Sequence, residues 1–185
     1  MTILKRGLVQ VYTGKGKGKT TAALGLAWRM LGAGGSVYVC QFLKPKNLAT
    51  GEGDWAQSIT QDAGQLQFDR LTIGWDMKLA ESDAEQRNIM QRALAEKLSQ
   101  IRQWARQGRW DLMILDEIVF CLHKNLVRRE EVLGVMNERA AHVELVLTGR
   151  GADEYLIGHA DLVTEMREVK HPFTQGISAR RGIEY

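Results

Sequence analysis

The sequence is short of cysteine, proline and long apolar runs, and the shortages of cysteine and of apolar runs each argue against a class of protein. It holds two cysteines and two prolines in 185 residues. Cys40 and Cys121 lie in or beside apolar runs, where a buried thiol is favoured over a disulfide or a metal ligand. No stretch of about 18 apolar residues occurs, and residues 1–6 lack the apolar segment of a signal peptide. We therefore expect a soluble, cytoplasmic protein that does not contact a membrane.

The chain also lacks a strong excess of one charge. It has 25 Lys and Arg residues against 22 Asp and Glu residues, which gives a net charge of +3. This mild basic excess suits an anionic ligand but is too small to indicate nucleic-acid binding, so we expect no nucleic-acid partner. A chain of this length buries roughly 70% of its unfolded surface. We expect a single domain, residues 1–185.

Residues 13–21 form a loop rich in glycine and lysine, Thr-Gly-Lys-Gly-Lys-Gly-Lys-Thr-Thr. Glycines let backbone N–H groups turn toward an anion, and a following helix adds the positive end of its dipole. Lys19 can neutralise phosphate charge, and the hydroxyl of Thr20 can ligate Mg²⁺. The predicted nucleotide-binding residues in this loop are Gly14, Lys15, Gly16, Lys17, Gly18, Lys19, Thr20 and Thr21.

The loop departs from the strict P-loop pattern at one position, where Thr13 replaces the first glycine. Gly14 and Gly16 can supply the missing flexibility. The alternative is a flexible linker, but residues 8–12 resemble a strand and residues 20–27 a helix, as the motif requires. Two further lysines in the loop, Lys15 and Lys17, favour a polyphosphate over a monophosphate.

Apolar runs of strand length alternate with helical patterns along the chain. Strands are expected at 7–12, 36–41, 66–71, 112–115, 143–147 and 162–166, and helices at 19–31 and 82–106. Ser82 and Glu85 suggest a capping box, Gly108 a helix end, and residues 42–55 a loop. This alternation predicts an α/β fold with a mainly parallel sheet flanked by helices.

Charged side chains follow two of the expected strands. Asp116 and Glu117 end a buried strand, as the Walker B carboxylates that hold Mg²⁺ do, although a strand-end acid can also cap a helix. Arg150 follows residues 143–147 and could reach the phosphates, but a surface salt bridge is nearly as plausible. With a P-loop in the same domain we predict that Thr20, Asp116 and Glu117 serve the metal.

Four of the five tryptophans fall into two groups. Trp75 lies in an irregular loop, where it can wall a flat ligand or pack beneath its own loop. Trp28, Trp104 and Trp110 lie on or at the ends of regular elements, and we expect them in the core. Among the four histidines, His171 is the candidate site residue.

Several segments together resemble the P-loop type of ATP:corrinoid adenosyltransferases, the cob(I)yrinic acid a,c-diamide adenosyltransferases. The segments are residues 13–23, 39–44 (Val-Cys-Gln-Phe-Leu-Lys), 114–117 (Ile-Leu-Asp-Glu), 147–151 (Leu-Thr-Gly-Arg-Gly) and the C-terminal block 169–185. The P-loop alone is generic, whereas residues 41–44, 148–151 and the C-terminal block are more specific. The likeness extends from residue 7 to residue 185.

The resemblance implies a RecA-like P-loop fold and transfer of the 5′-deoxyadenosyl group of ATP to cobalt(I) of a corrinoid, with triphosphate as the leaving group. It implies Lys19, Thr20 and Trp75 as catalytic residues, Mg²⁺ as cofactor, a homodimer and a flavoprotein electron donor. The acceptor can be cob(I)alamin, cobinamide or cob(I)yrinic acid a,c-diamide. Relatives carry Phe-Thr-Trp where this chain has Ile73-Gly74-Trp75, so one expected aromatic ring is replaced by an aliphatic side chain.

Other functions of a P-loop domain stay open at this point. One is a RecA-like ATPase coupled to nucleic acid, in which Glu117 would orient the attacking water. A second is a small-molecule kinase, and a third is a nucleotide-dependent binding protein without catalysis. A GTPase is disfavoured because the guanine-reading Asn-Lys-x-Asp motif is absent from the sequence. Adenosyl transfer fits the lack of an evident Ser-His or Cys-His pair, because cobalt(I) is itself the nucleophile.

Overall fold

The described strands form one parallel sheet. The computed structural model describes residues 2–43, 50–55, 65–71 and 83–184. Its strands are β1 (Val9–Thr13), β2 (Val37–Gln41), β3 (Leu66–Arg70), β4 (Leu112–Asp116), β5 (Glu144–Thr148) and β6 (Leu162–Glu165). They are arranged in the order β3-β2-β4-β5-β1-β6, and every pair is parallel. The predicted α/β fold with a mainly parallel sheet is confirmed.

The strand order places the functional strands close together. One strand, β5, separates the P-loop strand β1 from the carboxylate strand β4, which is a RecA-like arrangement. Because all strands run in the same direction, their carboxyl ends meet at one edge of the sheet. Ligands of such open α/β sheets bind outside that edge.

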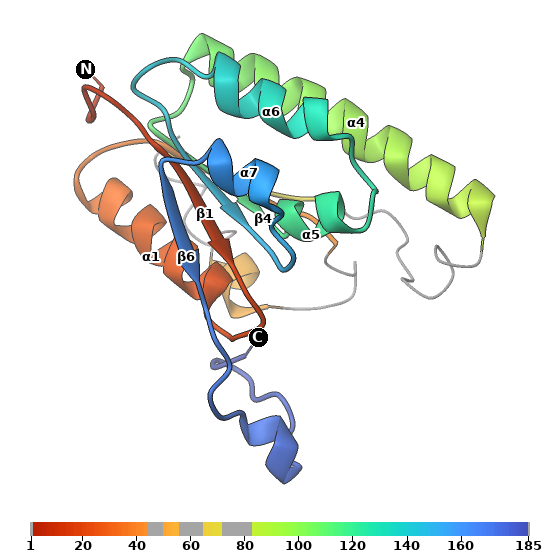
Figure 1. The fold of residues 1–185 in the computed structure, drawn as a ribbon. Coiled ribbons are helices and arrows are strands. Elements are labelled where there is room, and N and C mark those ends of the chain that lie inside the picture. Colours follow the sequence, from red (N-terminus) through yellow and green to blue (C-terminus); the bar gives the residue numbers. More distant parts are fainter. Residues whose placement is uncertain (1, 44–49, 56–64, 72–82, 185) are drawn as a thin grey trace.

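Helices cover both faces of the sheet (Figure 1). They are α1 (Lys19–Gly32), α4 (Ala84–Gln107), α5 (Ile118–His123), α6 (Arg129–Glu138) and α7 (Glu154–Gly158), with a 3₁₀ turn η1 (Pro172–Gln175). Successive strand residues face opposite sides. Leu112 and Ile114 therefore belong to the core beneath α1, whereas Met113 and Leu115 pack in the core with α4 and α6.

Some helix boundaries differ from the predictions. Helix α4 begins after Asp83, whose side chain accepts hydrogen bonds from the backbone N–H of Glu85 and Gln86, so the N-cap is Asp83 and not Ser82. Ser82 itself lies outside the described residues. Gly108 ends α4 as predicted, with a left-handed φ of 63°. Residues 51–55, expected as part of a loop, are helical.

The tryptophan prediction was right for two residues and wrong for one. Trp110 is buried, and Trp104 packs against the core. Trp28 is 67% exposed, because its position on α1 turns the indole away from the sheet. It stacks on Trp55. Trp75 falls outside the described residues.

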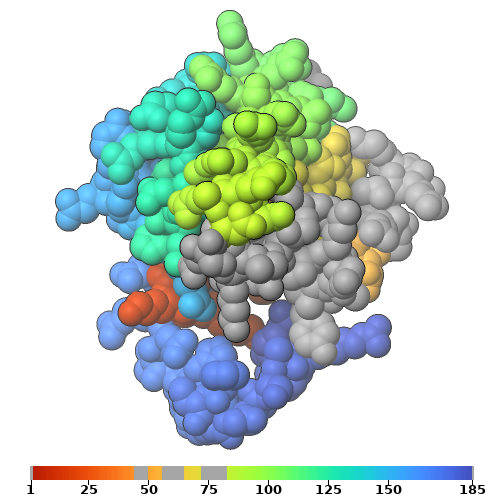
Figure 2. All heavy atoms as spheres, turned by 90° about the vertical axis from the view of Figure 1, so that its right-hand side faces the viewer, coloured from red at the N-terminus to blue at the C-terminus, as the bar shows by residue number. Residues whose placement is uncertain are grey.

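The C-terminal segment leaves the sheet after β6 and lies beside the P-loop. Figure 2 shows these residues gathered at one end of the molecule. Lys17 and Glu184 form an ion pair with 2.8 Å between Nζ and Oε1, which ties the segment to the loop. In the described part of the chain, no helix is long and apolar enough to cross a membrane. Both cysteines are buried and unpaired, as expected.

Candidate functional site

The P-loop connects β1 to α1 and depends on its glycines. Gly14 and Gly18 have φ of 93° and 109°, a left-handed region that glycine adopts without strain. At Gly16 the reason is space, because an added Cβ would lie 2.7 Å from the carbonyl oxygen of Met166. Thr13, which replaces the first glycine of the motif, still belongs to β1, and its hydroxyl accepts a hydrogen bond from the N–H of Ala152 at 3.2 Å.

Lys19 is the cation at the centre of the loop. It is 7% exposed, and its Nζ donates to the carbonyl oxygens of Gly14 at 2.9 Å and Gly16 at 2.7 Å. Burial lowers the pKa of the Lys19 amine; the carboxylate of Glu117 opposes this shift, and the guanidinium of Arg150 adds to it. The loop therefore holds the desolvated ammonium group of Lys19 at a place where phosphate oxygens can replace the carbonyl oxygens of Gly14 and Gly16 as its hydrogen-bond acceptors.

Asp116 collects three hydrogen bonds at the end of β4. Its Oδ1 accepts from the hydroxyls of Thr20 at 2.8 Å and Thr148 at 2.7 Å, and its Oδ2 accepts from Nε2 of Gln41 at 3.2 Å. The residue is 1% exposed. Gln41, Asp116 and Thr148 end the neighbouring strands β2, β4 and β5, so their side chains lie at the same edge of the sheet. Thr20, directly after the P-loop lysine, is the fourth residue of this group.

Glu117 follows Asp116 and turns the chain from β4 into α5. Its φ of 67° is unusual for a residue with a side chain, and its backbone N–H donates to Oγ1 of Thr148 at 3.0 Å. Thr148 thus contacts both acids. The sequence identified Asp116 and Glu117 as candidates but not Thr148 and Gln41. Both residues lie in segments that resemble the family, but their contacts with Asp116 depend on which strands are neighbours in the sheet.

The oxygen atoms here fit Mg²⁺ chemistry. Thr20 offers a hydroxyl next to the carboxylate of Asp116, and Glu117 lines the adjoining cavity. Mg²⁺ uses one or two carboxylates and completes its shell with water and substrate phosphates. Among the described residues, no group of three or more His, Cys, Asp or Glu is placed to hold a metal. One hydroxyl and one or two carboxylates suit a metal that completes its coordination with water and nucleotide phosphates.

A cavity of about 580 Å³ opens above the loop. Its lining includes the predicted residues Lys15, Gly16, Lys17, Gly18, Lys19, Thr20, Thr21, Glu117 and Arg150. It also includes His171 and residues 182–184 of the C-terminal block. Two predicted residues lie outside the lining: Gly14 accepts from Lys19, and Asp116 lies behind Thr20. The structure thus gathers every predicted site residue that it describes around the loop.

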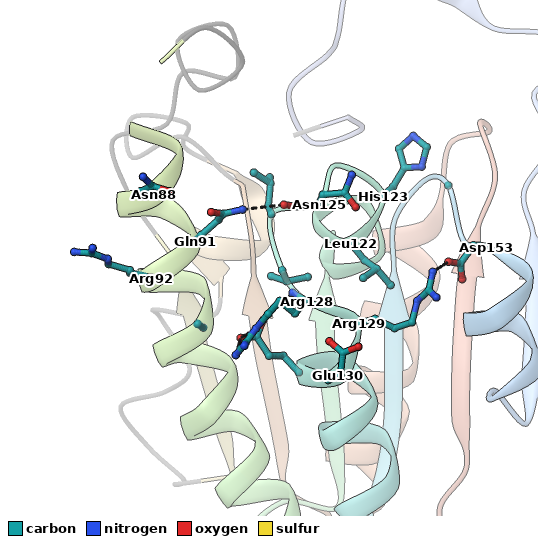
Figure 3. A pocket seen from close by; sticks show the side chains of 15 residues that line it. Asn88, Gln91, Arg92, Leu122, His123, Asn125, Arg128, Arg129, Glu130 and Asp153 are labelled. Atoms are coloured by element: carbon teal, nitrogen blue, oxygen red, sulfur yellow. Dashed lines mark hydrogen bonds and ion pairs between the residues drawn. The ribbon is translucent and has the colours of Figure 1, made fainter. Parts of the chain in front are cut away.

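A second cavity, of about 860 Å³, lies between α4 and the turn that joins α5 to α6. Figure 3 shows Gln91 of α4 directed at Asn125, whose carbonyl oxygen accepts a hydrogen bond from Gln91 Nε2 at 3.0 Å. Arg129 pairs with Asp153 at 2.6 Å on the opposite side. No residue of the P-loop lines this cavity. The P-loop residues line the cavity of about 580 Å³ instead.

A strand, a glycine-lysine loop, a helix that begins at the loop lysine, and a strand-end carboxylate on the loop threonine define a P-loop nucleotide-binding protein. The family model of the ATP:corrinoid adenosyltransferases BtuR/CobO/CobP matches residues 5–185. The chain belongs to this family, and it is an ATP:corrinoid adenosyltransferase.

Curated relatives resemble the chain over most of its length. A corrinoid adenosyltransferase of Escherichia coli K12 is 35% identical over 98% of this chain and 87% of its own. The corrinoid adenosyltransferase CobA of Salmonella typhimurium is 33% identical with the same shares covered. A corrinoid adenosyltransferase of a Sinorhizobium species is 38% identical over 98% of this chain and 81% of its own.

Proposed function

We propose that the chain transfers the 5′-deoxyadenosyl group of ATP to cobalt(I) of a corrinoid and releases inorganic triphosphate. The electron pair of cobalt(I) forms the cobalt–carbon bond. The bond between C5′ and the α-phosphate oxygen breaks, and its electrons stay on the triphosphate. The observation that supports this is the buried Lys19 within a loop that carries two further lysines, because the departing group is a polyanion.

The chain's part in this reaction is to hold ATP and to stabilise the leaving group. No general base is needed, since the nucleophile carries no proton to remove. Lys19 replaces its contacts with the loop carbonyls by contacts with phosphate oxygens, and Lys15 and Arg150 line the same cavity. Preorganised cations in a site that excludes water stabilise developing charge more strongly than they would in water.

Mg²⁺ would be held by Thr20 and the two acids Asp116 and Glu117. When bound, it neutralises charge on the triphosphate oxygens. Asp116 already orients the hydroxyl of Thr20 at 2.8 Å, so the protein supplies a fixed pair of oxygen donors. We also propose Trp75, outside the described residues, as the aromatic residue beside the corrinoid.

Further parts of the proposal come from the resemblance. They are a homodimer, a reduced flavoprotein as electron donor, and cob(I)alamin, cobinamide or cob(I)yrinic acid a,c-diamide as the acceptor. The single domain and the cytoplasmic location are proposed from the chain length and the lack of long apolar segments. The rival function is an ATPase or kinase, in which Glu117 would orient a water or a hydroxyl acceptor. A phosphate-binding cavity at the sheet edge is common to all three reactions, and the family membership favours adenosyl transfer. The fate of ATP distinguishes between them.

The test is an anaerobic incubation of the protein with ATP, Mg²⁺ and chemically reduced cob(I)alamin. We expect stoichiometric triphosphate together with a light-sensitive cobalt–carbon product, and we expect Lys19→Ala to abolish both. ADP and phosphate with an unchanged corrinoid would refute adenosyl transfer to this acceptor. Repeating the incubation with cobinamide and with the a,c-diamide compares the three acceptors.

A further inference from the structure

Residues 180–184 of the C-terminal segment form a turn against the P-loop. The backbone N–H of Glu184 donates to the carbonyl oxygen of Arg180 at 2.9 Å, and the N–H of Arg180 donates to Oε2 of Glu184 at 2.8 Å. Oε1 of the same carboxylate forms the ion pair with Lys17. Lys17 and Glu184 both line the cavity above the P-loop. The turn therefore places a carboxylate and a guanidinium group beside a P-loop lysine.

Glu184 lies between the two cations. Arg180 donates from Nε to Oε2 at 3.2 Å and from Nη2 to Oε1 at 3.1 Å. Because Lys17 Nζ also contacts Oε1, at 2.8 Å, the two nitrogen atoms can be no farther apart than the 2.8 Å and 3.1 Å distances laid end to end. Hydrogen bonds from Arg180, and after them the one from Lys17, lower the pKa of the Glu184 carboxyl to about 2. The cluster therefore already holds an oxygen anion.

A phosphate group fits the same two cations. The planar fork of a guanidinium group matches carboxylate and phosphate oxygens alike, and a lysine acts as a point charge beside it. The side chains of Lys17 and Arg180 are 45% and 56% exposed. Ion pairs this exposed change an equilibrium by no more than about fivefold. A triphosphate carries several charges and also meets Lys19 in this cavity, so it can displace one carboxylate.

We propose that Arg180 and Lys17 together bind a phosphate group of ATP, which displaces Glu184 from them. The turn can open without unpacking the core, because residues 180–183 are exposed and open space surrounds the Cβ position of Gly182. This inference deepens the proposed function and rests on it only for triphosphate binding at the P-loop. In adenosyl transfer, Arg180 adds a cation that stabilises the leaving group.

The test measures the affinity for tripolyphosphate by titration calorimetry, with Mg²⁺ and without corrinoid. Glu184→Gln is the background, because glutamine keeps an acceptor for the N–H of Arg180 but carries no charge. In that background we expect Arg180→Ala to weaken binding by about 5- to 12-fold, between the effects of an exposed ion pair and of a charge-assisted hydrogen bond. If Arg180 acts only by holding Glu184, the substitution has no effect there.

Two matched variants in the same background control for charge and geometry. Arg181→Ala removes the same charge from the neighbouring residue, which is also exposed, and should change the affinity by less than about twofold. Arg180→Lys keeps the charge but loses the planar fork, so it should recover part of the affinity that Arg180→Ala loses.

Two results would overturn the role of Arg180. One is an unchanged affinity on Arg180→Ala in the Glu184→Gln background. The other is an equal loss in Arg181→Ala, which would show a general effect of net charge. Lys19→Ala separates this inference from the proposed function. If Lys19→Ala weakens binding and Arg180→Ala does not, Arg180 alone is refuted; if neither does, triphosphate binding at the P-loop is refuted as well.

Discussion

Thr148→Val tests how much the Thr148 hydroxyl stabilises the end of β4, where it is hydrogen-bonded to both Asp116 and Glu117. In the folded protein the Thr148 hydroxyl donates to Oδ1 of Asp116 at 2.7 Å and accepts from the N–H of Glu117 at 3.0 Å. The residue is 0% exposed, so water cannot replace either bond freely. Valine has nearly the same shape but neither donates nor accepts.

The expected loss of stability follows from these two bonds. A hydrogen bond to a charged acceptor contributes about 1.5–3 kcal/mol and a neutral one about 0.5–1.5 kcal/mol. The added methyl group of valine returns about 0.8 kcal/mol through burial. The free energy of unfolding should therefore fall by about 1–4 kcal/mol, which lowers Tm by about 2–16 °C for a chain of this length.

Urea unfolding followed by circular dichroism measures this change. The matched control is Thr164→Val on the exposed edge strand β6, for which we expect a change within about 0.5 kcal/mol. A stability of Thr148→Val equal to the unaltered protein would refute the bridging role of the hydroxyl. An equal loss of stability in both variants would show that the effect comes from placing valine in a strand and not from the lost hydrogen bonds to Asp116 and Glu117.

Three further predictions concern the loop, the tail and the core. Gly16→Ala should lower stability by about 1–3 kcal/mol in urea unfolding and weaken tripolyphosphate binding, because its Cβ would lie 2.7 Å from a backbone oxygen; Gly158→Ala, with open space around it, should do neither. Glu184→Gln should tighten tripolyphosphate binding in calorimetry, since Lys17 loses its ion pair, and an unchanged affinity would show that Lys17 does not reach the ligand. Burial raises the pKa of the Cys40 thiol to about 12, so a thiol reagent at pH 8 should modify it only after unfolding; rapid reaction of the folded protein would contradict its burial.

The sequence was sufficient for the P-loop because its requirements are local. Glycines at positions of positive φ, a lysine at the start of a helix and a hydroxyl beside it are properties of consecutive residues. Gln41 and Thr148 could not be assigned in the same way. Their contacts with Asp116 exist because β2 and β5 are the two neighbours of β4. The order of strands in a sheet cannot be deduced from any single segment of the sequence.

Helix α5 shows a second limit of sequence reasoning. Helix α5 has six residues, Ile-Val-Phe-Cys-Leu-His, which are mostly apolar and follow an apolar strand almost directly. Such a short run has no clear period of its own. Trp28 shows a third limit. Helical periodicity gives the directions of side chains relative to one another, but which of them face the sheet depends on how α1 packs against it.

Gln41 connects the end of β4 to residues 50–55. Its Nε2 donates to Asp116 and also to Glu52 at 3.2 Å, and its Oε1 accepts from Nε of Arg70 at 3.1 Å. Arg70 in turn donates to the hydroxyl of Thr50. Residues 50–55 are therefore connected to the carboxylate proposed for the metal through the hydrogen bonds of Gln41 and Arg70. Gln41→Leu removes this connection while keeping a side chain of similar size. Because the connection includes the carboxylate proposed for the metal, this variant should weaken the binding of Mg²⁺ and tripolyphosphate in calorimetry; an unchanged affinity would show that Gln41 does not position Asp116.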